Sequence, residues 1–418
     1  MSTSTSSTLE HTYAHLASRL GQENARLQGN AILAAPGDAA QIAELLRWAQ
    51  ANQVAVIPTG GGTKLDWGNP VTAGILLSLE RLRRVREHAW QDMTCTVEAG
   101  CAWSAMQAEL SRHGQMVALD PLWPDRATVG GVVATNDSGA LRLRYGGLRD
   151  IIIGMTIVLA DGTIARAGGK VVKNVAGYDL HKLMTGSFGT LGVIAEVNFR
   201  LHPCEDRPKS WTVLAGRSPG NDAMAFSEPL HALMDSQMVL SSVQLRTSEH
   251  ECALDIRIAA VPECLADHEA RVRNFFRAFK VCEADEAVWQ ARQQLFDREG
   301  AVVLKVSAPP GEICECIAEV QRCATAHEVS VTAAGQATGS ITVALQPANA
   351  NTAALIENLR SVVSNRGGSA MVARTPNVLR SQVDVWGPAP DALPLMREIK
   401  RRFDPQRILN PGRYVGNI

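Results

Sequence analysis

The sequence has almost no net charge and no long apolar stretch. Its 418 residues include 41 Lys and Arg and 42 Asp and Glu, which gives a formal net charge of -1. Proteins that bind nucleic acid usually carry a basic excess, so we expect no nucleic-acid partner. The longest apolar run, residues 151–160, is about half as long as the roughly 20-residue helix that crosses a bilayer. We therefore expect contact with a membrane only through partner proteins.

The sequence also lacks a secretory leader and a disulfide framework. Residues 1–15 are polar and contain neither the basic nor the apolar stretch that directs export. The nine cysteines are odd in number and scattered, which indicates a reducing, cytoplasmic environment. No C-x-x-C-x-x-C run is present for an iron–sulfur cluster. Cys314, Cys316, Cys323 and His327 follow a helical pattern, and we interpret them as a buried helix face, not a metal site.

The composition, 46% apolar and 20% charged residues, is typical of a globular protein with two or three domains. Residues 1–27 are predicted to be an N-terminal lead-in with a short helix. Residues 28–205 mix strands and helices with many glycines and form the first domain. Residues 206–375 alternate strands and helices in a way that predicts an antiparallel sheet with helices on one face. Residues 376–418 contain a predicted helix at 393–403 and then an ordered turn. The predicted fold class is α+β.

The stretch IPTGGGTK, residues 57–64, places three glycines directly after a short apolar run that predicts a strand. Glycine has no Cβ and accepts φ > 0, so a ligand can approach the backbone and the amides can form a nest for an anion. Thr63 adds a hydroxyl donor and Lys64 a positive charge, which together suit a diphosphate. The order differs from both the G-x-x-x-x-G-K-[ST] and the G-x-G-x-x-G phosphate-binding patterns. The alternative is a tight turn whose glycines face solvent.

Two later segments repeat this theme. Gly130 and Gly131 fall inside a short helix predicted to begin at Thr128, where each glycine costs about 1 kcal/mol relative to alanine. A close neighbour, such as a flat ring system or a pyrophosphate, would explain them. Residues 135–139 supply short polar side chains and another glycine, and residues 186–192 supply three glycines before a predicted buried strand.

Four motifs in this order resemble the FAD-binding family named after vanillyl-alcohol oxidase and p-cresol methylhydroxylase (PCMH). They are VIPTGGGTK, TVGGVVATNDSG with RYGGLRD, KNVAGYDLHKLMTGSFGTLGVI, and FDPQRILNPGRY. Within this family the chain looks like the FAD-binding, E-type subunits of bacterial glycolate oxidase. The resemblance implies a two-part PCMH-type FAD-binding domain, an α+β cap domain, and a C-terminal segment that returns to the FAD domain.

The resemblance also implies the residues that hold the cofactor. The diphosphate would lie on the glycine loop, defined here as residues 59–64, and other segments would line the rest of FAD. No histidine stands in the loop, so we expect FAD to be bound non-covalently. The implied cofactor-binding residues are Thr59, Gly60, Gly61, Gly62, Thr63, Lys64, Pro121, Thr128, Gly130, Gly131, Thr135, Ser138, Gly139, Tyr145, Gly146, Gly192, Val193, Ile194 and Asn410.

The sequence departs from the family in one stretch. Hydroxy-acid dehydrogenases of the family carry a late H-x-x-G-D-G-N-x-H motif whose histidines bind a metal that holds the substrate. The corresponding residues 333–343, AAGQATGSITV, contain neither His nor Asp, so we expect no metal there and name no catalytic residue. His181 is a candidate base, and Arg144, Lys173 or Arg374 a candidate carboxylate ligand, but a structural role is the simpler interpretation of each.

Three hypotheses of function follow. In the first, the chain is the FAD-binding subunit of a complex that oxidises glycolate to glyoxylate. A D-type FAD subunit would take most of the hydride, and an iron–sulfur subunit would pass electrons on. These partners would place the cytoplasmic complex peripherally at the inner membrane. In the second, the chain is a stand-alone FAD-dependent alcohol or 2-hydroxy-acid dehydrogenase. In the third, it is an assembly subunit whose FAD fold is mainly structural. Fold alone does not decide between them.

Overall fold

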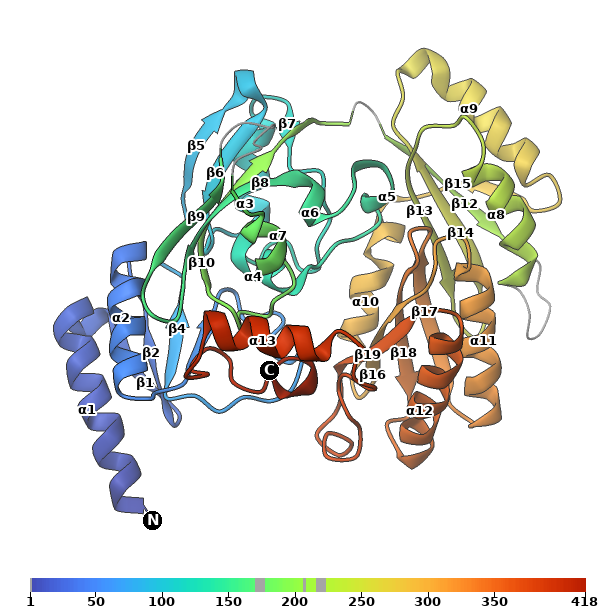
Figure 1. Cartoon of the computed structure of the whole chain (residues 1–418). Coiled ribbons are helices and arrows are strands. Elements are labelled where there is room, and N and C mark those ends of the chain that lie inside the picture. The colour runs from blue at the N-terminus through green and yellow to red at the C-terminus, as the bar shows by residue number, and fades with distance from the viewer. Residues whose placement is uncertain (1, 170–176, 206–207, 216–222) are drawn as a thin grey trace. The chain divides into compact units, whose positions relative to one another are not determined.

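The computed structural model describes residues 2–169, 177–205, 208–215 and 223–418 (Figure 1). The chain divides into two compact units, each with its own hydrophobic core. The first unit contains residues 1–138, 147–204 and 389–418, and the second contains residues 139–146 and 205–388. The sequence placed domain boundaries after 205 and 375. In the structure the C-terminal return begins at 389, and the excursion of residues 139–146 into the second unit was not foreseen.

The first unit contains two main sheets. One has four strands in the order β1-β2-β4-β3, and both β2 and β3 run parallel to β4. The other is an antiparallel sheet in the order β5-β6-β10-β8-β9. The short strands β7 and β11 pair with each other in a separate two-stranded sheet. The strands are β1 (Ala25–Gln28), β2 (Ala31–Ala34), β3 (Val56–Thr59), β4 (Ile75–Ser78), β5 (Val85–Ala89), β6 (Thr94–Glu98), β7 (Gln115–Met116), β8 (Ile152–Val158), β9 (Ile164–Gly168), β10 (Val193–Arg200) and β11 (His202–Pro203).

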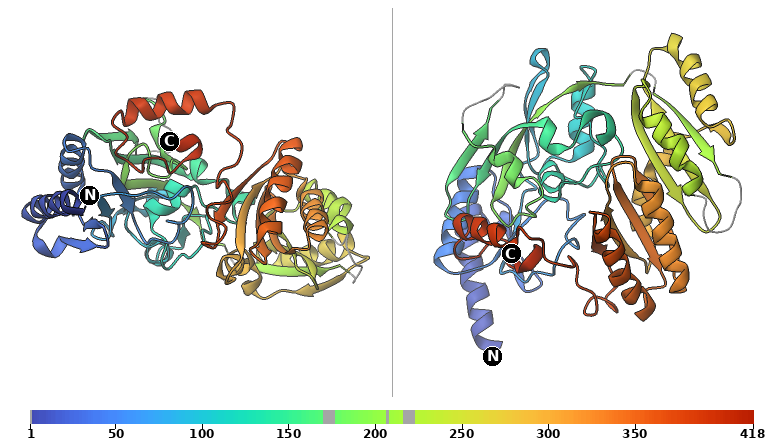
Figure 2. Two further views of the ribbon diagram at one scale, coloured as in Figure 1. Left: turned by 90° about the horizontal axis from the view of Figure 1, so that it is seen from below. Right: turned by 45° about the vertical axis from the view of Figure 1, so that its right-hand side comes forward.

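The helices of the first unit follow the sequence signals closely. Asp38 caps α2, because its carboxylate accepts from the Gln41 amide at 2.8 Å, and the apolar face of α2 is buried. Figures 1 and 2 show α1 beside α2, where His15 stacks on Trp48. The predicted lead-in is therefore mostly one long helix. The helices are α1 (Ser2–Leu20), α2 (Ala39–Ala51), α3 (Trp103–Ser111), α4 (Val129–Thr135), α6 (Leu148–Ile151), α7 (Leu180–Met184) and α13 (Leu393–Phe403).

The second unit is built on one eight-stranded antiparallel sheet in the order β15-β12-β14-β13-β17-β18-β16-β19. Four helices, α8, α9, α11 and α12, cover one face, and α10 lies on the other (Figure 1). The strands are β12 (Lys209–Leu214), β13 (Leu240–Thr247), β14 (Cys252–Ile258), β15 (Lys280–Glu283), β16 (Val302–Ser307), β17 (Ser330–Gln336), β18 (Ser340–Gln346) and β19 (Ser369–Arg374); the helices are α5 (Arg142–Tyr145), α8 (Ser227–Met234), α9 (Pro262–Phe275), α10 (Ala291–Asp297), α11 (Ile313–Ala326) and α12 (Ala350–Asn365).

The cysteine-rich helix face is buried, as the spacing indicated. Cys314, Cys316 and Cys323 lie on α11 and belong to the core of the second unit. Burial raises the pKa of the Cys314 thiol to about 12 and that of Cys316 to about 11. These thiols therefore stay protonated at neutral pH and pack as small apolar groups.

Candidate functional site

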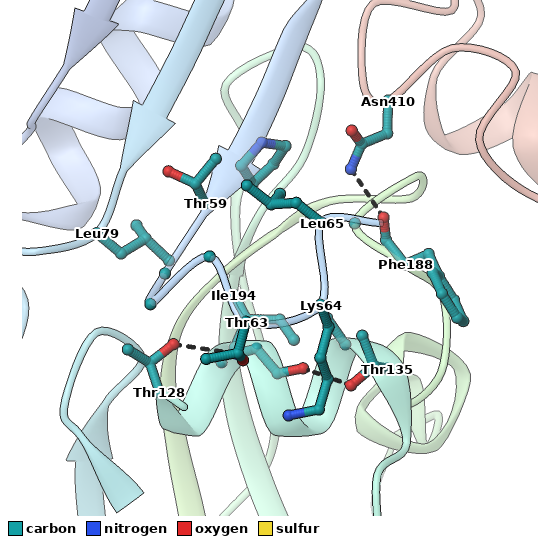
Figure 3. A pocket seen from close by; sticks show the side chains of 18 of the residues that line it. Thr59, Thr63, Lys64, Leu65, Leu79, Thr128, Thr135, Phe188, Ile194 and Asn410 are labelled. Atoms are coloured by element: carbon teal, nitrogen blue, oxygen red, sulfur yellow. Dashed lines mark hydrogen bonds between the residues drawn. The ribbon is translucent and has the colours of Figure 1, made fainter. Parts of the chain in front are cut away.

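A cavity in the first unit is lined by four segments that are far apart in the sequence, residues 58–65, 128–135, 188–194 and 410–413, together with Leu79. Its volume is about 90 Å³, room for roughly three water molecules. Pockets for whole ligands are typically about 300–1,000 Å³, so this cavity encloses only part of a dinucleotide. The lining residues are Pro58, Thr59, Gly60, Gly61, Gly62, Thr63, Lys64, Leu65, Leu79, Thr128, Gly130, Gly131, Ala134, Thr135, Phe188, Gly189, Gly192, Ile194, Asn410 and Arg413 (Figure 3).

The first two loop glycines are required by packing within the protein. A Cβ on Gly61 would lie 1.7 Å from the carbonyl oxygen of Arg126, and one on Gly60 would lie 2.0 Å from the hydroxyl oxygen of Thr128. The glycine loop therefore lies directly against the residues that begin α4. Gly62 differs, because its φ of 69° is in the left-handed region and a Cβ there would meet only Leu65. Packing against Arg126 and Thr128 is thus a second reason for glycine at positions 60 and 61, and their contact with a ligand stays a prediction.

The loop nevertheless offers main-chain donors to a ligand. In the described part of the chain, the amides of Gly60, Gly61, Gly62 and Thr63 donate to no other residue. These residues lie at the surface of the cavity, just beyond the end of β3. Successive backbone N–H groups of this kind form concave sites that attract anions. The loop can therefore receive a diphosphate through its backbone.

Lys64 has a different role from the one its sequence suggested. Its ammonium lies 3.2 Å from the Asp137 carboxylate, and both side chains are almost completely buried. The rings of Trp67 and Trp123 lie 5.8 and 5.5 Å from the same nitrogen. Figure 3 shows the side chain pointing past α4 and away from the loop. The charge of Lys64 is thus already compensated inside the protein, so the main-chain amides are the principal donors of the loop.

The second wall of the cavity is α4. Thr128 is its N-cap, and the Thr128 hydroxyl accepts from the Gly131 amide at 3.4 Å. Gly130 packs against Ala99, because a Cβ on Gly130 would lie 2.8 Å from the Ala99 methyl. Gly131 has no such constraint beyond a 3.2 Å approach to the Thr128 hydroxyl, and it faces the cavity. The close neighbour that explains Gly130 is therefore the Ala99 side chain. At Gly131 the space for a ligand remains open.

The third and fourth walls meet at Asn410. Its amide nitrogen donates to the Phe188 carbonyl at 2.8 Å, which fixes the orientation of the side chain (Figure 3). Its Oδ1 is buried and accepts no hydrogen bond within the described residues. Arg413 lies nearby and donates to the Leu65 carbonyl at 2.6 Å. A buried acceptor is costly unless it is paired, and Asn410 belongs to the cavity lining, so this residue suits a ligand with a hydroxyl or N–H group.

Thirteen of the nineteen residues implied by the resemblance line this cavity, so the structure brings most of the expected set together. Pro121, Ser138 and Val193 belong to the first unit but do not line it, and Gly139, Tyr145 and Gly146 belong to the second unit. Their contact with FAD stays a prediction. Seven lining residues were not predicted, five of them within the quoted motifs: Pro58, Leu65, Leu79, Ala134, Phe188, Gly189 and Arg413.

Tyr145 is held within the second unit. Its hydroxyl donates to the Glu205 carboxylate at 3.2 Å, and Glu205 also pairs with Arg257 at 3.2 Å. Burial, followed by the charge of Glu205, raises the pKa of Tyr145 to about 12. The excursion of residues 139–146 is thereby tied to β14, which carries Arg257.

Three of the candidate catalytic residues lie within the described ranges, and the role of each stays a prediction. His181 is 5% exposed, and burial lowers its pKa. Arg374 donates to the Phe296 carbonyl, and the Arg144 guanidinium lies 5.5 Å from the Tyr145 ring. Lys173 lies outside the described residues. Over the ranges that the structure describes, no three His, Cys, Asp or Glu side chains group in a way that could hold a metal ion.

The residues of the cavity fit a flavin dinucleotide on these grounds. The lining includes loop residues whose main-chain amides have no partner among the described residues, Asn410 with a buried, unpaired acceptor, and the apolar side chains of Leu79, Ala134 and Ile194. Residues 31–168 match the family model described as an FAD binding domain, and residues 388–414 match the C-terminal domain of FAD linked oxidases. The chain is an FAD-dependent oxidoreductase with an FAD-binding domain. FAD is its cofactor, as predicted, and the cavity draws residues from both matched regions.

Relatives match over nearly the whole chain. D-lactate dehydrogenase of Archaeoglobus fulgidus is 28% identical and the match covers 94% of this chain and 93% of that protein. D-2-hydroxyglutarate dehydrogenase of Xanthomonas citri is 27% identical, with 91% and 88% covered. Glycolate oxidase subunit GlcD of Bacillus subtilis is 24% identical, with 91% and 87% covered.

Solved structures confirm the fold class. p-Cresol methylhydroxylase with substrate bound superimposes with a TM-score of 0.76 at 17% identity, covering 97% of this chain and 96% of that one. The prediction of a PCMH-type FAD-binding fold with an α+β domain is therefore correct. None of the described helices is long and apolar enough to span a membrane.

Proposed function

We propose that the chain takes part in the FAD-dependent oxidation of a small 2-hydroxy acid. The observation that carries this proposal is the cradle of unpaired loop amides in a chain that matches, over more than nine-tenths of its length, relatives named for D-lactate, D-2-hydroxyglutarate and glycolate. Bound FAD supplies a two-electron acceptor for the carbon that carries the hydroxyl group.

More specifically, we propose an E-type, FAD-binding subunit of a glycolate oxidase complex that forms glyoxylate. A D-type FAD subunit would take most of the hydride, and an iron–sulfur subunit would carry electrons on, which would place a cytoplasmic complex at the membrane through its partners. Support comes from residues 333–343, which lack imidazole and carboxylate ligands. These residues comprise the end of β17, the turn after it and the start of β18. Gly335 packs on Ile317 and Gly339 on Ala308.

A second candidate is a stand-alone FAD-dependent 2-hydroxy-acid dehydrogenase. The end-to-end match with the D-lactate and D-2-hydroxyglutarate dehydrogenases favours it to about the same degree. A mainly structural role in an assembly is the remaining alternative.

The chain's own residues bind and orient the cofactor in each case. The loop amides would receive the diphosphate, Asn410 Oδ1 would accept from a hydroxyl or N–H group, and the apolar sides would exclude water. Among the described residues that line the cavity there is no histidine, so non-covalent binding remains our expectation for the glycine loop.

An anaerobic bleaching experiment tests the proposal. The chain is purified by a tag under gentle conditions, once alone and once with any proteins that co-purify, and its visible flavin spectrum is recorded. Glycolate, D-lactate and D-2-hydroxyglutarate are then added separately. We expect a yellow chain that is bleached by one of these acids only when its partners are present. Bleaching of the isolated chain would select the stand-alone enzyme, and a flavin that none of the acids reduces in either preparation would contradict the proposed substrate class.

A further inference from the structure

The ammonium group of Lys400 joins three segments behind the cavity. Lys400 lies on α13 and is 3% exposed. Its Nζ donates to the Thr190 carbonyl at 2.8 Å, to the Leu409 carbonyl at 2.9 Å and to the Asp404 carboxylate at 2.7 Å. None of these residues is part of the cavity lining, although the chain neighbours of two of them are.

Asp404 completes this cluster. It is fully buried, and its carboxylate also accepts from the Ile408 amide at 3.0 Å and from the Leu409 amide at 2.8 Å. The turn that it closes contains two non-glycine residues in the left-handed region, Arg407 at φ 56° and Asn410 at φ 42°. Such conformations persist only where the surroundings hold them in place. The Lys400–Asp404 pair provides that constraint for the turn that ends at Asn410.

The cluster connects to every wall of the cavity except α4. Thr190 follows the lining residues Phe188 and Gly189, and Leu409 precedes Asn410. The same turn also hydrogen-bonds to β3, because the Val56 amide donates to Ile408 at 2.7 Å and the Asn410 amide donates to Val56 at 3.0 Å. β3 leads directly into the glycine loop. A shift of the Lys400 ammonium would therefore move both the Asn410 wall and the base of the loop.

We propose that Lys400 is a positioning residue for FAD, which sets the geometry of the cofactor site through the Thr190 and Leu409 carbonyls without touching the cofactor. This inference goes beyond the proposed function, since it concerns how FAD is held whatever the substrate or partners are. The competing explanation is a role in stability alone. Buried ion pairs can often be replaced by neutral groups without loss of stability, whereas removal of one partner is strongly destabilising. The two explanations therefore diverge when both partners are neutralised together.

The test compares FAD affinity with stability in the full chain. The variants are Lys400→Met, Lys400→Met with Asp404→Asn, and Lys400→Arg. The control is Arg246→Met with Asp255→Asn, an ion pair of the second unit in which Asp255 is buried and Arg246 is partly exposed. For each apoprotein, urea unfolding gives the stability and quenching of flavin fluorescence gives the dissociation constant for FAD. We expect the neutral Lys400–Asp404 double variant to unfold near the wild-type urea concentration but to bind FAD at least about tenfold more weakly. The control is expected to keep wild-type FAD affinity.

Wild-type FAD affinity in the folded Lys400–Asp404 double variant would overturn the proposal. If that variant does not fold, Lys400→Arg decides the question. Arginine keeps the charge opposite Asp404 but cannot place one nitrogen against both carbonyls, so we expect near-normal stability and several-fold weaker FAD binding. Unchanged FAD affinity in Lys400→Arg would refute the positioning role, and so would an equal loss of FAD affinity in the Arg246–Asp255 control.

Discussion

Replacement of Gly61 by alanine should remove most of the FAD affinity. A Cβ at this position would lie 1.7 Å from the Arg126 carbonyl oxygen, and real Cβ atoms stay at least 3.0 Å from such an atom. The loop must therefore move by about 1.3 Å at Gly61. A hydrogen bond of ordinary length does not survive such a displacement.

The size of the effect follows from the bonds that are lost. A hydrogen bond to a charged group contributes about 1.5–3 kcal/mol. If two of the four loop amides lose contact with the diphosphate, the binding free energy of FAD falls by about 3–6 kcal/mol. The dissociation constant for FAD would then rise roughly 10²- to 10⁴-fold. Titration of the apoprotein with FAD, followed by flavin fluorescence, measures this constant directly.

A matched control separates a local effect from general destabilisation. Gly368→Ala introduces a similar backbone clash, 2.2 Å from the Ser307 carbonyl oxygen, in the second unit. We expect this variant to lose stability but to keep its FAD affinity. A Gly61→Ala protein that unfolds cooperatively and binds FAD within about threefold of wild type would refute the role assigned to the loop.

Three further predictions concern buried groups. Asp137→Asn should destabilise the protein by about 3–5 kcal/mol in urea unfolding, because it leaves the Lys64 ammonium buried without its anion. The double variant Lys64→Met with Asp137→Asn should recover most of this loss, and equal stability of the single and double variants would contradict the prediction. Since the pKa of Tyr145 is raised to about 12, the contribution of its neutral hydroxyl to stability is complete below pH 10 and is lost as the pH rises through 12. Ultraviolet titration should show one phenol that ionises near pH 12, and Tyr145→Phe should remove this transition; an unchanged titration curve in that variant would contradict the assignment. In a thiol titration of the native protein at pH 8, the exposed Cys204 and Cys264 should react first. Burial raises the pKa values of Cys314 and Cys95 to about 12, so these thiols should react only after unfolding, and early modification of Cys314 would disprove its burial.

Local sequence patterns predicted the elements that carry the site. The run before Gly60 predicted β3, Thr128 predicted the start of α4, and the helix at 393–403 appears with those bounds. These predictions succeed because capping, glycine placement and apolar periodicity act within a few residues. The resemblance of four motifs then identified FAD, which the family matches confirm.

Long-range contacts account for what the sequence could not supply. Nothing near Gly61 or Gly130 in the sequence reveals that Arg126 and Ala99 occupy the space a side chain would need. The compensation of Lys64 by Asp137 likewise depends on how two distant segments meet. The excursion that carries Tyr145 into the second unit is a property of tertiary packing. In each case the sequence identified the residue, but the residue that contacts it is determined by the tertiary fold.

A crystal structure of the chain grown with FAD tests the central claim most directly. The account predicts diphosphate oxygens about 2.7–3.2 Å from amide nitrogens of residues 60–63, with a hydroxyl or N–H group of FAD against Asn410 Oδ1. FAD bound with its phosphates outside this cavity, or held mainly by side-chain cations, would contradict the account.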